Sequence, residues 1–268
     1  MNPLLELEGL CVDYGRGRHA RRVVDDVSLT IDSGETLALV GESGSGKTTI
    51  GRAVLGMIRP ASGRVRIDGV DLAIRSLRER RRWAGTMQAI FQDPYRSLNP
   101  SLRVGVSIGE PLSVSSGVSA RERARVVADV VERVGLPPDT RARFPVSFSG
   151  GQRQRIGIAR ALSVRPRLIV CDEPTSALDV STQRQVLDLL AEIQQQTSVG
   201  YLFISHDLAV VRSFADRVAV LQSGRIVEIG SARQVCEDPQ HAYTKALVAA
   251  APVPDPRIQR RRRIEAAA

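Results

Sequence analysis

Hydrophobic and polar residues alternate in short runs along the first third of the chain. Leu4–Glu8, Val27–Ile31 and Gly63–Gly69 repeat with a period of two and are bounded by glycines or other turn residues, which is typical of strands. Thr36–Val40 is instead a continuous apolar run, as expected of a parallel strand that is buried on both faces. This third is therefore predicted to consist of strands and turns.

The middle of the chain is helical, and buried strands return after it. Ala120–Val134 has the spacing of an amphipathic helix and is followed by Gly135. Leu168–Cys171 and Tyr201–Ile204 are short apolar runs, and Val186–Ile193 between them repeats at helical spacing. Strand, helix, strand is the order of a right-handed βαβ unit, so the pattern predicts an α/β fold.

A hairpin and a proline-punctuated extension complete the chain. Val218–Leu221 and Arg225–Glu228 flank Ser223 and Gly224, which is a hairpin signal. Beyond residue 236 the pattern becomes short-range and ends in an arginine cluster. We expect one main domain over residues 1–236 and a C-terminal extension over 237–268, with a disordered basic end.

Composition indicates a soluble globular protein with no membrane span of its own. The 268 residues are 43% hydrophobic and 25% charged, enough for one large α/β domain or two small ones. No apolar run approaches the roughly 18 residues that cross a bilayer, and the N-terminus lacks the features of a signal peptide. We therefore expect another chain to supply any membrane part.

The net charge of +9 does not by itself indicate a nucleic-acid partner. Residues 257–268 carry five arginines and one glutamate, which is +4 of the total. Lys47 and Lys245 are the only lysines among the 38 lysine and arginine residues, a pattern that a GC-rich genome explains. Aromatic residues, on which bases would stack, make up only 4% of the chain. We expect no nucleic-acid partner.

Three widely spaced cysteines form no metal-ligand pattern and are expected to be reduced: Cys11, Cys171 and Cys236.

A glycine-rich segment after the apolar strand matches the phosphate-loop pattern GxxxxGK[ST]. It comprises Gly41, Glu42, Ser43, Gly44, Ser45, Gly46, Lys47 and Thr48, with Thr49 next. Glycines let the backbone turn its N–H groups toward phosphate, and the following helix adds the positive end of its dipole. Lys47 would bind the β- and γ-phosphates, and the Thr48 hydroxyl would bind Mg²⁺. We expect ATP and Mg²⁺ here.

Acidic residues and a histidine follow two of the buried strands. Asp172 would hold Mg²⁺, and Glu173 would polarise the attacking water as a general base. His206 follows the strand Tyr201–Ile204, and we expect it near the γ-phosphate because ligands bind at the carboxyl edge of open α/β sheets. On its own, an Asp-Glu pair after a strand is explained equally well by a helix N-cap. The phosphate loop in the same chain favours the catalytic interpretation.

A second anion-binding turn precedes another apolar-periodic helix. It comprises Ser149, Gly150, Gly151 and Gln152. One ATP cannot occupy both turns if they lie on opposite sides of one subunit, whereas a head-to-tail dimer lets each turn cap the other subunit's γ-phosphate. This resembles the ABC ATPase family, whose signature is an SGGQ-type segment.

The resemblance spans residues 4 to about 250 and implies a fold as well as further site residues. The implied fold is that of a P-loop NTPase: a RecA-like α/β core, an antiparallel β subdomain and an inserted α-helical subdomain at about 94–155. The implied site residues are Gln92 of the Q-loop, which touches Mg²⁺ and the attacking water, Asp179 of the D-loop at the dimer interface, His206 as the switch histidine, and Tyr14, which stacks on adenine.

A finer resemblance points to the dipeptide/oligopeptide (and nickel) importer branch. It rests on Met87–Pro100, Cys171–Ser181 and Tyr201–Asp207. His241–Thr244 resembles the branch's C-terminal His-Pro-Tyr-Thr element, with Ala242 in place of proline. The resemblance implies an ATP-hydrolysing subunit that powers import of peptides or a related solute and lies peripherally on the cytoplasmic face of the cell membrane.

Partners follow from the same resemblance. We expect a second ABC ATPase subunit, identical or a sibling, two transmembrane permease subunits and, indirectly, an extracytoplasmic solute-binding protein. Pro94–Pro100 would receive the permease's coupling helix, although a turn-rich linker is the alternative. Three other functions remain open: import of nickel or another non-peptide solute, an ABC-type ATPase that acts on ribosomes or DNA, and a regulatory ATP binder without hydrolysis.

Overall fold

The N-terminal strands form an antiparallel sheet whose buried positions alternate. Its order is β2-β1-β4-β5, with Leu5 paired to Ile31 on one side and to Ile67 on the other. The strands are β1 (Leu5–Tyr14), β2 (Arg21–Ile31), β4 (Ser62–Ile67) and β5 (Val70–Asp71). The predicted strands over Leu4–Glu8 and Val27–Ile31 are confirmed, because alternate side chains bury one face of this sheet.

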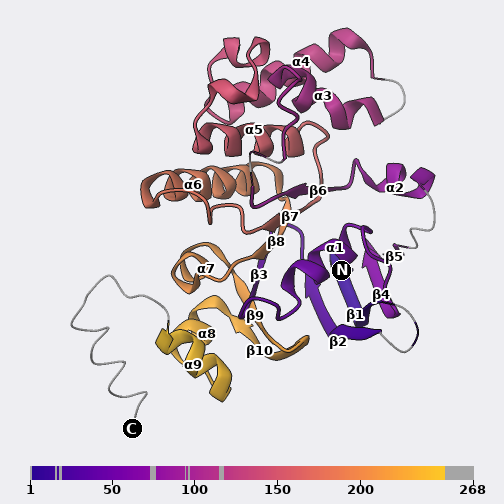
Figure 1. The fold of residues 1–268 in the computed structure, drawn as a ribbon, viewed down its shortest axis with the longest axis vertical. Helices are drawn as coiled ribbons and strands as arrows, with labels where there is room; N and C mark the ends of the chain where they lie inside the picture. Colours follow the sequence, from indigo (N-terminus) through magenta and orange to yellow (C-terminus); the bar gives the residue numbers. More distant parts are fainter. Residues whose placement is uncertain are drawn as a thin grey trace. The chain divides into compact units, whose positions relative to one another are not determined.

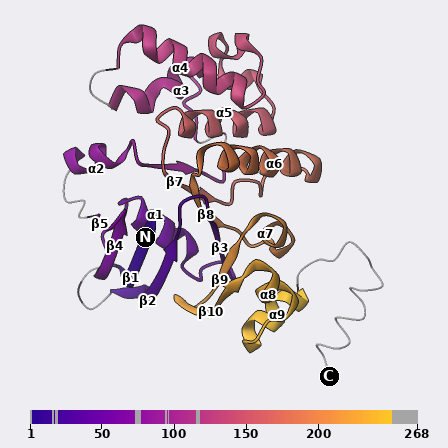
Figure 2. The ribbon, with the colours of Figure 1, turned by 180° about the vertical axis from the view of Figure 1, so that it is seen from behind.

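The computed structural model describes residues 2–15, 17, 20–72, 77–93, 95, 97–114 and 118–250. The chain forms two compact units, which Figures 1 and 2 show from opposite sides. Unit 1 comprises the described residues of Met1–Ile31, Glu35–Asp71 and Leu202–Ala268, and unit 2 those of Asp32–Gly34 and Leu72–Tyr201. The predicted basic end of the extension, 251–268, lies outside the described residues, and the predicted domain boundaries stay predictions.

Unit 1 also contains the apolar strand that the sequence predicts. β3 (Thr36–Val40) is buried at every residue and runs parallel to β9 (Arg217–Gln222). β9 continues into β10 (Arg225–Ser231) through Ser223 and Gly224, which both have positive φ, so the predicted hairpin is confirmed. β8 (Gly200–Ile204), of which Leu202–Ile204 belong to this unit, lies on the other side of β3. The helices are α1 (Lys47–Val54), α7 (Leu208–Phe214), α8 (Ala232–Glu237) and α9 (Ala242–Ala250).

Unit 2 combines a parallel strand pair with a group of helices. β6 (Met87–Ile90) runs parallel to β7 (Leu168–Asp172), which is buried up to its last residue. The helices are α2 (Leu77–Trp83), α3 (Val104–Val114), α4 (Ala120–Arg133), α5 (Gly150–Leu162) and α6 (Val180–Thr197), with short 3₁₀ turns η2 (Pro138–Ala142) and η3 (Pro145–Ser147). α3, α4 and α5 pack against one another, as both ribbon views show.

Helix α4 illustrates how the amphipathic pattern becomes structure. Ser119 caps it by accepting a hydrogen bond from the backbone N–H of Glu122. Val127, Val130 and Val131 are buried on one face, as the sequence predicts for this helix. None of the helices in the described part of the chain is long and apolar enough to cross a membrane.

Candidate functional site

The predicted phosphate loop connects β3 to α1 in unit 1, and two of its glycines are required by its geometry. Gly41 has φ 148° and Gly46 has φ 110°. A Cβ atom on Gly41 would lie 2.2 Å from the carbonyl oxygen of Leu221, and one on Gly46 would lie 2.9 Å from that of Val23. The loop is therefore pressed against backbone on both sides, which leaves no room for a side chain at either glycine.

A buried cation and an unsatisfied hydroxyl lie within this loop. Lys47 is 6% exposed, and its Nζ donates to the carbonyl oxygens of Gly41 at 2.7 Å and Glu42 at 2.8 Å. Ser45 Oγ is buried and has no hydrogen-bond partner among the described residues. Thr48 and Thr49 follow in the first turn of α1. A cation, a helix N-terminus and an unsatisfied hydroxyl together fit a bound polyphosphate.

Two other predicted residues belong to the same unit. Tyr14 is the last residue of β1, where it pairs with Arg21, and its side chain is 41% exposed. His206 is exposed and lies between β8 and α7, directly before Asp207, which caps α7. An exposed ring at Tyr14 has the surface that stacking on a base requires.

Unit 2 brings the predicted general base and the Q-loop glutamine into contact. Asp172 is the last residue of β7, and Glu173 follows it with φ 49°, an unusual conformation for a residue with a side chain. Gln92 Nε2 donates to Glu173 Oε2 at 3.1 Å. Ser176 Oγ donates to the carbonyl oxygen of Glu173 at 3.1 Å, which supports the turn. Strained backbone of this kind is characteristic of functional sites.

The serine-glycine turn begins helix α5 with a complete capping box. Ser149 Oγ accepts from the backbone N–H of Gln152 at 3.3 Å, and Gln152 Oε1 accepts from the N–H of Ser149 at 3.0 Å. The two groups thereby satisfy each other's unpaired donors. Ser149 and Gln152 are both exposed, and Gly150 is half-buried. The turn is therefore folded locally and open at its surface.

Asp179 lies beside this turn as the N-cap of α6. Its carboxylate accepts from the backbone N–H of Thr182 at 3.0 Å and from the hydroxyls of Ser181 and Thr182 at 2.6 and 2.7 Å. The hydrogen bonds from Ser181 and then Thr182 hold the pKa of Asp179 well below its usual range. A Cβ atom on Gly151 would lie 2.3 Å from Thr182 Cγ2, so the first turn of α6, which Asp179 caps, contacts the serine-glycine turn.

Sequence reasoning missed two residues that connect to these motifs. Arg153 is buried, its Nε donates to the carbonyl oxygen of Pro145 at 2.7 Å, and its guanidinium lies 3.8 Å from the centre of the Tyr95 ring. Tyr243 contacts the phosphate loop, where its hydroxyl oxygen accepts from the backbone N–H of Glu42 at 3.1 Å. Neither contact has a local signal in the sequence.

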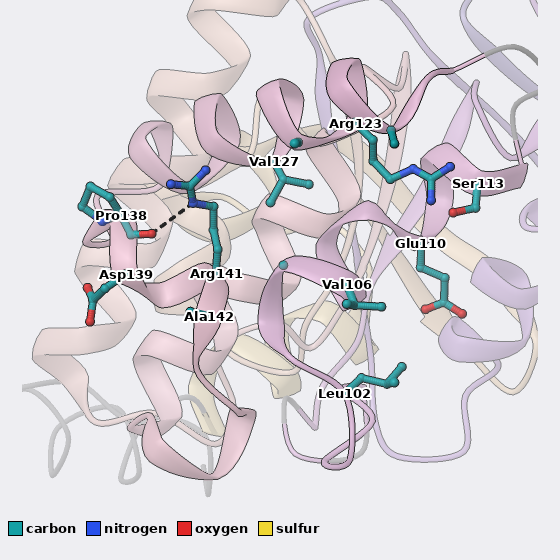
Figure 3. A pocket seen from close by; sticks show the side chains of 13 residues that line it. Leu102, Val106, Glu110, Ser113, Arg123, Val127, Pro138, Asp139, Arg141 and Ala142 are labelled. Carbon is teal, nitrogen blue, oxygen red and sulfur yellow. Dashed lines mark hydrogen bonds between the residues drawn. The ribbon is translucent and has the colours of Figure 1, made fainter.

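Unit 2 also contains a cavity of about 820 Å³ among α3, α4 and η2 (Figure 3). Leu102, Val106 and Val127 form its apolar lining, while Glu110 and Arg123 add charge. Among the described residues, none of the predicted site residues lines it. It is therefore a feature separate from the motifs above.

Comparison with known proteins identifies the family. Residues 24–176 match the family described as ABC transporter, and residues 227–268 match the family described as oligopeptide/dipeptide transporter, C-terminal region. The chain belongs to the ABC transporter family. A putative peptide import ATP-binding protein of Brucella ovis is 50% identical over 262 residues, which cover 98% of this chain and 83% of the relative. A probable peptide ABC transporter ATP-binding protein of Sinorhizobium fredii is 51% identical over 235 residues, which cover 88% of this chain and 67% of the relative.

Solved ABC cassettes share the fold. One is cbiO1 of Clostridium perfringens, part of the ABC transporter complex cbiONQ, with TM-score 0.80 and 25% identity over 97% of this chain and 98% of that chain. Another is the cassette MJ0796 in a dimeric post-hydrolysis state bound to ADP and phosphate, with TM-score 0.76 and 28% identity over 85% and 99%. These likenesses confirm the predicted P-loop α/β fold with antiparallel and helical parts. This chain is an ABC-type ATPase, as predicted.

Proposed function

We propose that this ATPase powers solute import as one half of an ATP-sandwiching dimer on a separate permease. The hydrogen bond from the Gln92 amide to the Glu173 carboxylate supports the hydrolytic part of the proposal most directly, because ATP cleavage needs a general base with a water-orienting group beside it. Nucleotide binding is assigned to Tyr14, Gly41, Glu42, Ser43, Gly44, Ser45, Gly46, Lys47, Thr48, Thr49, Ser149, Gly150, Gly151, Gln152 and Asp179.

The residues of the phosphate loop fit a nucleoside triphosphate. When nucleotide binds, Lys47 exchanges its two carbonyl partners for phosphate oxygens, and the unpaired Ser45 hydroxyl gains a partner. Thr48, Asp172 and Gln92 would hold Mg²⁺, which neutralises charge that develops on the phosphates. Oxygen ligands of this kind suit that hard cation.

Glu173 accepts a proton from the attacking water, and His206 supports the γ-phosphate. Glu173→Gln keeps the contact with Gln92 but removes the base, so we expect steady-state ATP turnover to fall by about 10²–10⁴-fold. Glu132→Gln, at an exposed position on α4, is the matched control and should leave turnover unchanged. Normal hydrolysis by Glu173→Gln would exclude Glu173 from the role of base.

The second ATP-binding surface of each site comes from the partner subunit. The Ser149 turn is exposed and already capped, so it is available to a nucleotide held by another copy or a sibling chain. The dimeric ADP- and phosphate-bound state of MJ0796 supports this arrangement. We expect Glu173→Gln to elute as a dimer only with ATP present. A monomeric elution volume at saturating ATP would contradict the sandwich.

Peptides are the proposed solute class. The peptide-import names of the relatives and the match of residues 227–268 to the oligopeptide/dipeptide transporter C-terminal region support this assignment. The chain would act peripherally on the cytoplasmic face of the cell membrane, with two permease subunits and an extracytoplasmic binding protein. ATP turnover of the reconstituted complex should rise with peptide-loaded binding protein. Stimulation by nickel but not by peptides would overturn the peptide assignment.

Permease docking is proposed at the segment Pro94–Pro100, part of which lies outside the described residues. Tyr95 supports it, because this residue is 62% exposed while its ring stacks with the Arg153 guanidinium at 3.8 Å. Tyr95→Ala should reduce co-purification with the permease while ATP binding is kept. Met57→Ala, another exposed apolar position, is the control and should co-purify normally. Full retention of the permease by Tyr95→Ala would count against this docking surface.

A further inference from the structure

Helix α9 contacts the phosphate loop from a position 201 residues further along the chain. The backbone N–H of Glu42 donates to the Tyr243 hydroxyl at 3.1 Å. The carbonyl of the same residue accepts from Lys47 Nζ at 2.8 Å and from the backbone N–H of Ser45 at 3.2 Å. Glu42 is thus held on both its N–H and its carbonyl side, once by α9 and otherwise by the loop itself.

Glu228 on β10 anchors the start of α9. Its carboxylate accepts from the backbone N–H of Gln240 at 2.8 Å and from that of His241 at 3.0 Å. The pairing of β10 with β9 shifts register between Ile226 and Glu228, and such a bulge re-aims a side chain. Burial raises the pKa of Glu228, but the hydrogen bonds that it accepts, among them that from Gln240, outweigh burial and keep the pKa below its usual range. The carboxylate is therefore ionised and available to hold α9.

The first turn of α9 orients Tyr243. His241 Nδ1 accepts from the backbone N–H of Tyr243 at 3.2 Å, and the carbonyl of His241 accepts from the N–H of Lys245 at 3.0 Å. Ala242 is the first helical residue, a position that also tolerates proline because no intrahelical N–H bond is lost there. The alanine in this element therefore leaves the helix start intact.

We infer that Tyr243 is a positioning residue of the phosphate loop, through which α9 sets the affinity for ATP. The inference rests on the phosphate-loop assignment under the proposed function. When the Lys47 ammonium turns to phosphate, Glu42 loses that bond at its carbonyl. The Tyr243 contact at its N–H remains and keeps the start of the loop in place. A loop that is already held in its binding conformation loses less backbone conformational entropy when ATP binds, so its affinity for ATP is higher.

The test removes only the hydroxyl. Tyr243→Phe in the full chain should raise the Kd and KM for MgATP about 3–10-fold, the range for loss of one hydrogen bond, with kcat unchanged. Tyr201→Phe is the matched control, because its hydroxyl donates to the carbonyl oxygen of Leu190 at 3.0 Å in unit 2. It should lower the melting temperature and leave KM unchanged. An unchanged or lowered KM in Tyr243→Phe would overturn the inference.

A second pair of variants keeps the inference separate from the phosphate-loop assignment. Glu228→Ala releases the anchor of α9 and should also raise the KM for MgATP. The double variant Tyr243→Phe with Glu228→Ala should have a KM no higher than that of the more impaired single variant. Additive effects would contradict a shared path. Lys47→Ala tests the loop itself: if it loses ATP binding while Tyr243→Phe binds as wild type, only the role of α9 fails. If Lys47→Ala binds ATP normally, the loop assignment fails.

Discussion

The phosphate loop of unit 1 and the serine-glycine turn of unit 2 have similar compositions but are stabilised in different ways. Both place small residues at the N-terminus of a helix. Gly41 in the first is pressed against the backbone of Leu221, and Glu42 is tied to Tyr243. The hydrogen bonds that close the second are those between Ser149 and Gln152, which are both exposed, and the Thr182 side chain packs against its Gly151. One turn is shaped by distant segments and the other by its own capping box.

This difference suits the two proposed roles. A loop that must surround phosphate gains from rigidity, since its amides are then oriented before the ligand arrives. A turn that meets a nucleotide on another subunit must instead keep its surface open until the dimer closes. Local capping achieves this, because it needs no neighbouring segment over the turn.

Among the tests of this comparison, the largest effect is expected from adding a methyl group to each turn. Gly41→Ala sets a Cβ atom against a backbone oxygen at positive φ, so unfolding free energy should fall by about 1–3 kcal/mol and ATP affinity by about 10–100-fold. Gly151→Ala meets the Thr182 side chain and should keep the ATP affinity of the isolated chain while lowering turnover by the dimer. Titration with MgATP and turnover assays measure both. Equal losses of ATP affinity would remove the distinction between the two turns.

Loss of a cap should have a smaller effect and sharpen the contrast. Ser149→Ala removes the acceptor for Gln152 and should destabilise the chain by about 0.5–2 kcal/mol, with reduced turnover and unchanged ATP affinity. Ser119→Ala removes the equivalent cap of α4 and should lower the free energy of unfolding by a similar amount, with turnover unchanged. Denaturant unfolding and ATPase assays separate the two. If both variants lose turnover equally, the Ser149 effect is one of stability alone.

The smallest expected effect concerns pH. The pKa of Asp179 lies below its ordinary value of about 3.9, chiefly because Ser181 and Thr182 donate hydrogen bonds to the carboxylate. Its contribution to stability is therefore fully present above that ordinary pKa and disappears as pH falls through the lower folded value. Asp179→Asn keeps an N-cap and should flatten the stability profile below about pH 4. Parallel profiles for both proteins would show that Asp179 contributes nothing there.

Most of the strands and helices were accessible from periodicity. β3 matches the predicted Thr36–Val40 run, and α4 matches the predicted amphipathic helix within a residue. Their burial follows directly from which side chains face one side. In the extension beyond residue 236 the pattern is too short-range to indicate a helix. Its described part is nevertheless ordered in α9, which Glu228 and Tyr243 hold by hydrogen bonds that no local pattern encodes.

The sequence by itself determined where the phosphate loop, the Asp172–Glu173 pair and the turn at Ser149 lie. Each depends on residue types at fixed short spacings, and local backbone geometry translates such spacings directly into shape. Only the tertiary structure decided that Gln92 reaches Glu173, that Arg153 supports Tyr95 and that Tyr243 holds Glu42. These contacts join segments far apart in the chain, and their partners are set by how the strands and helices pack rather than by the residues beside them.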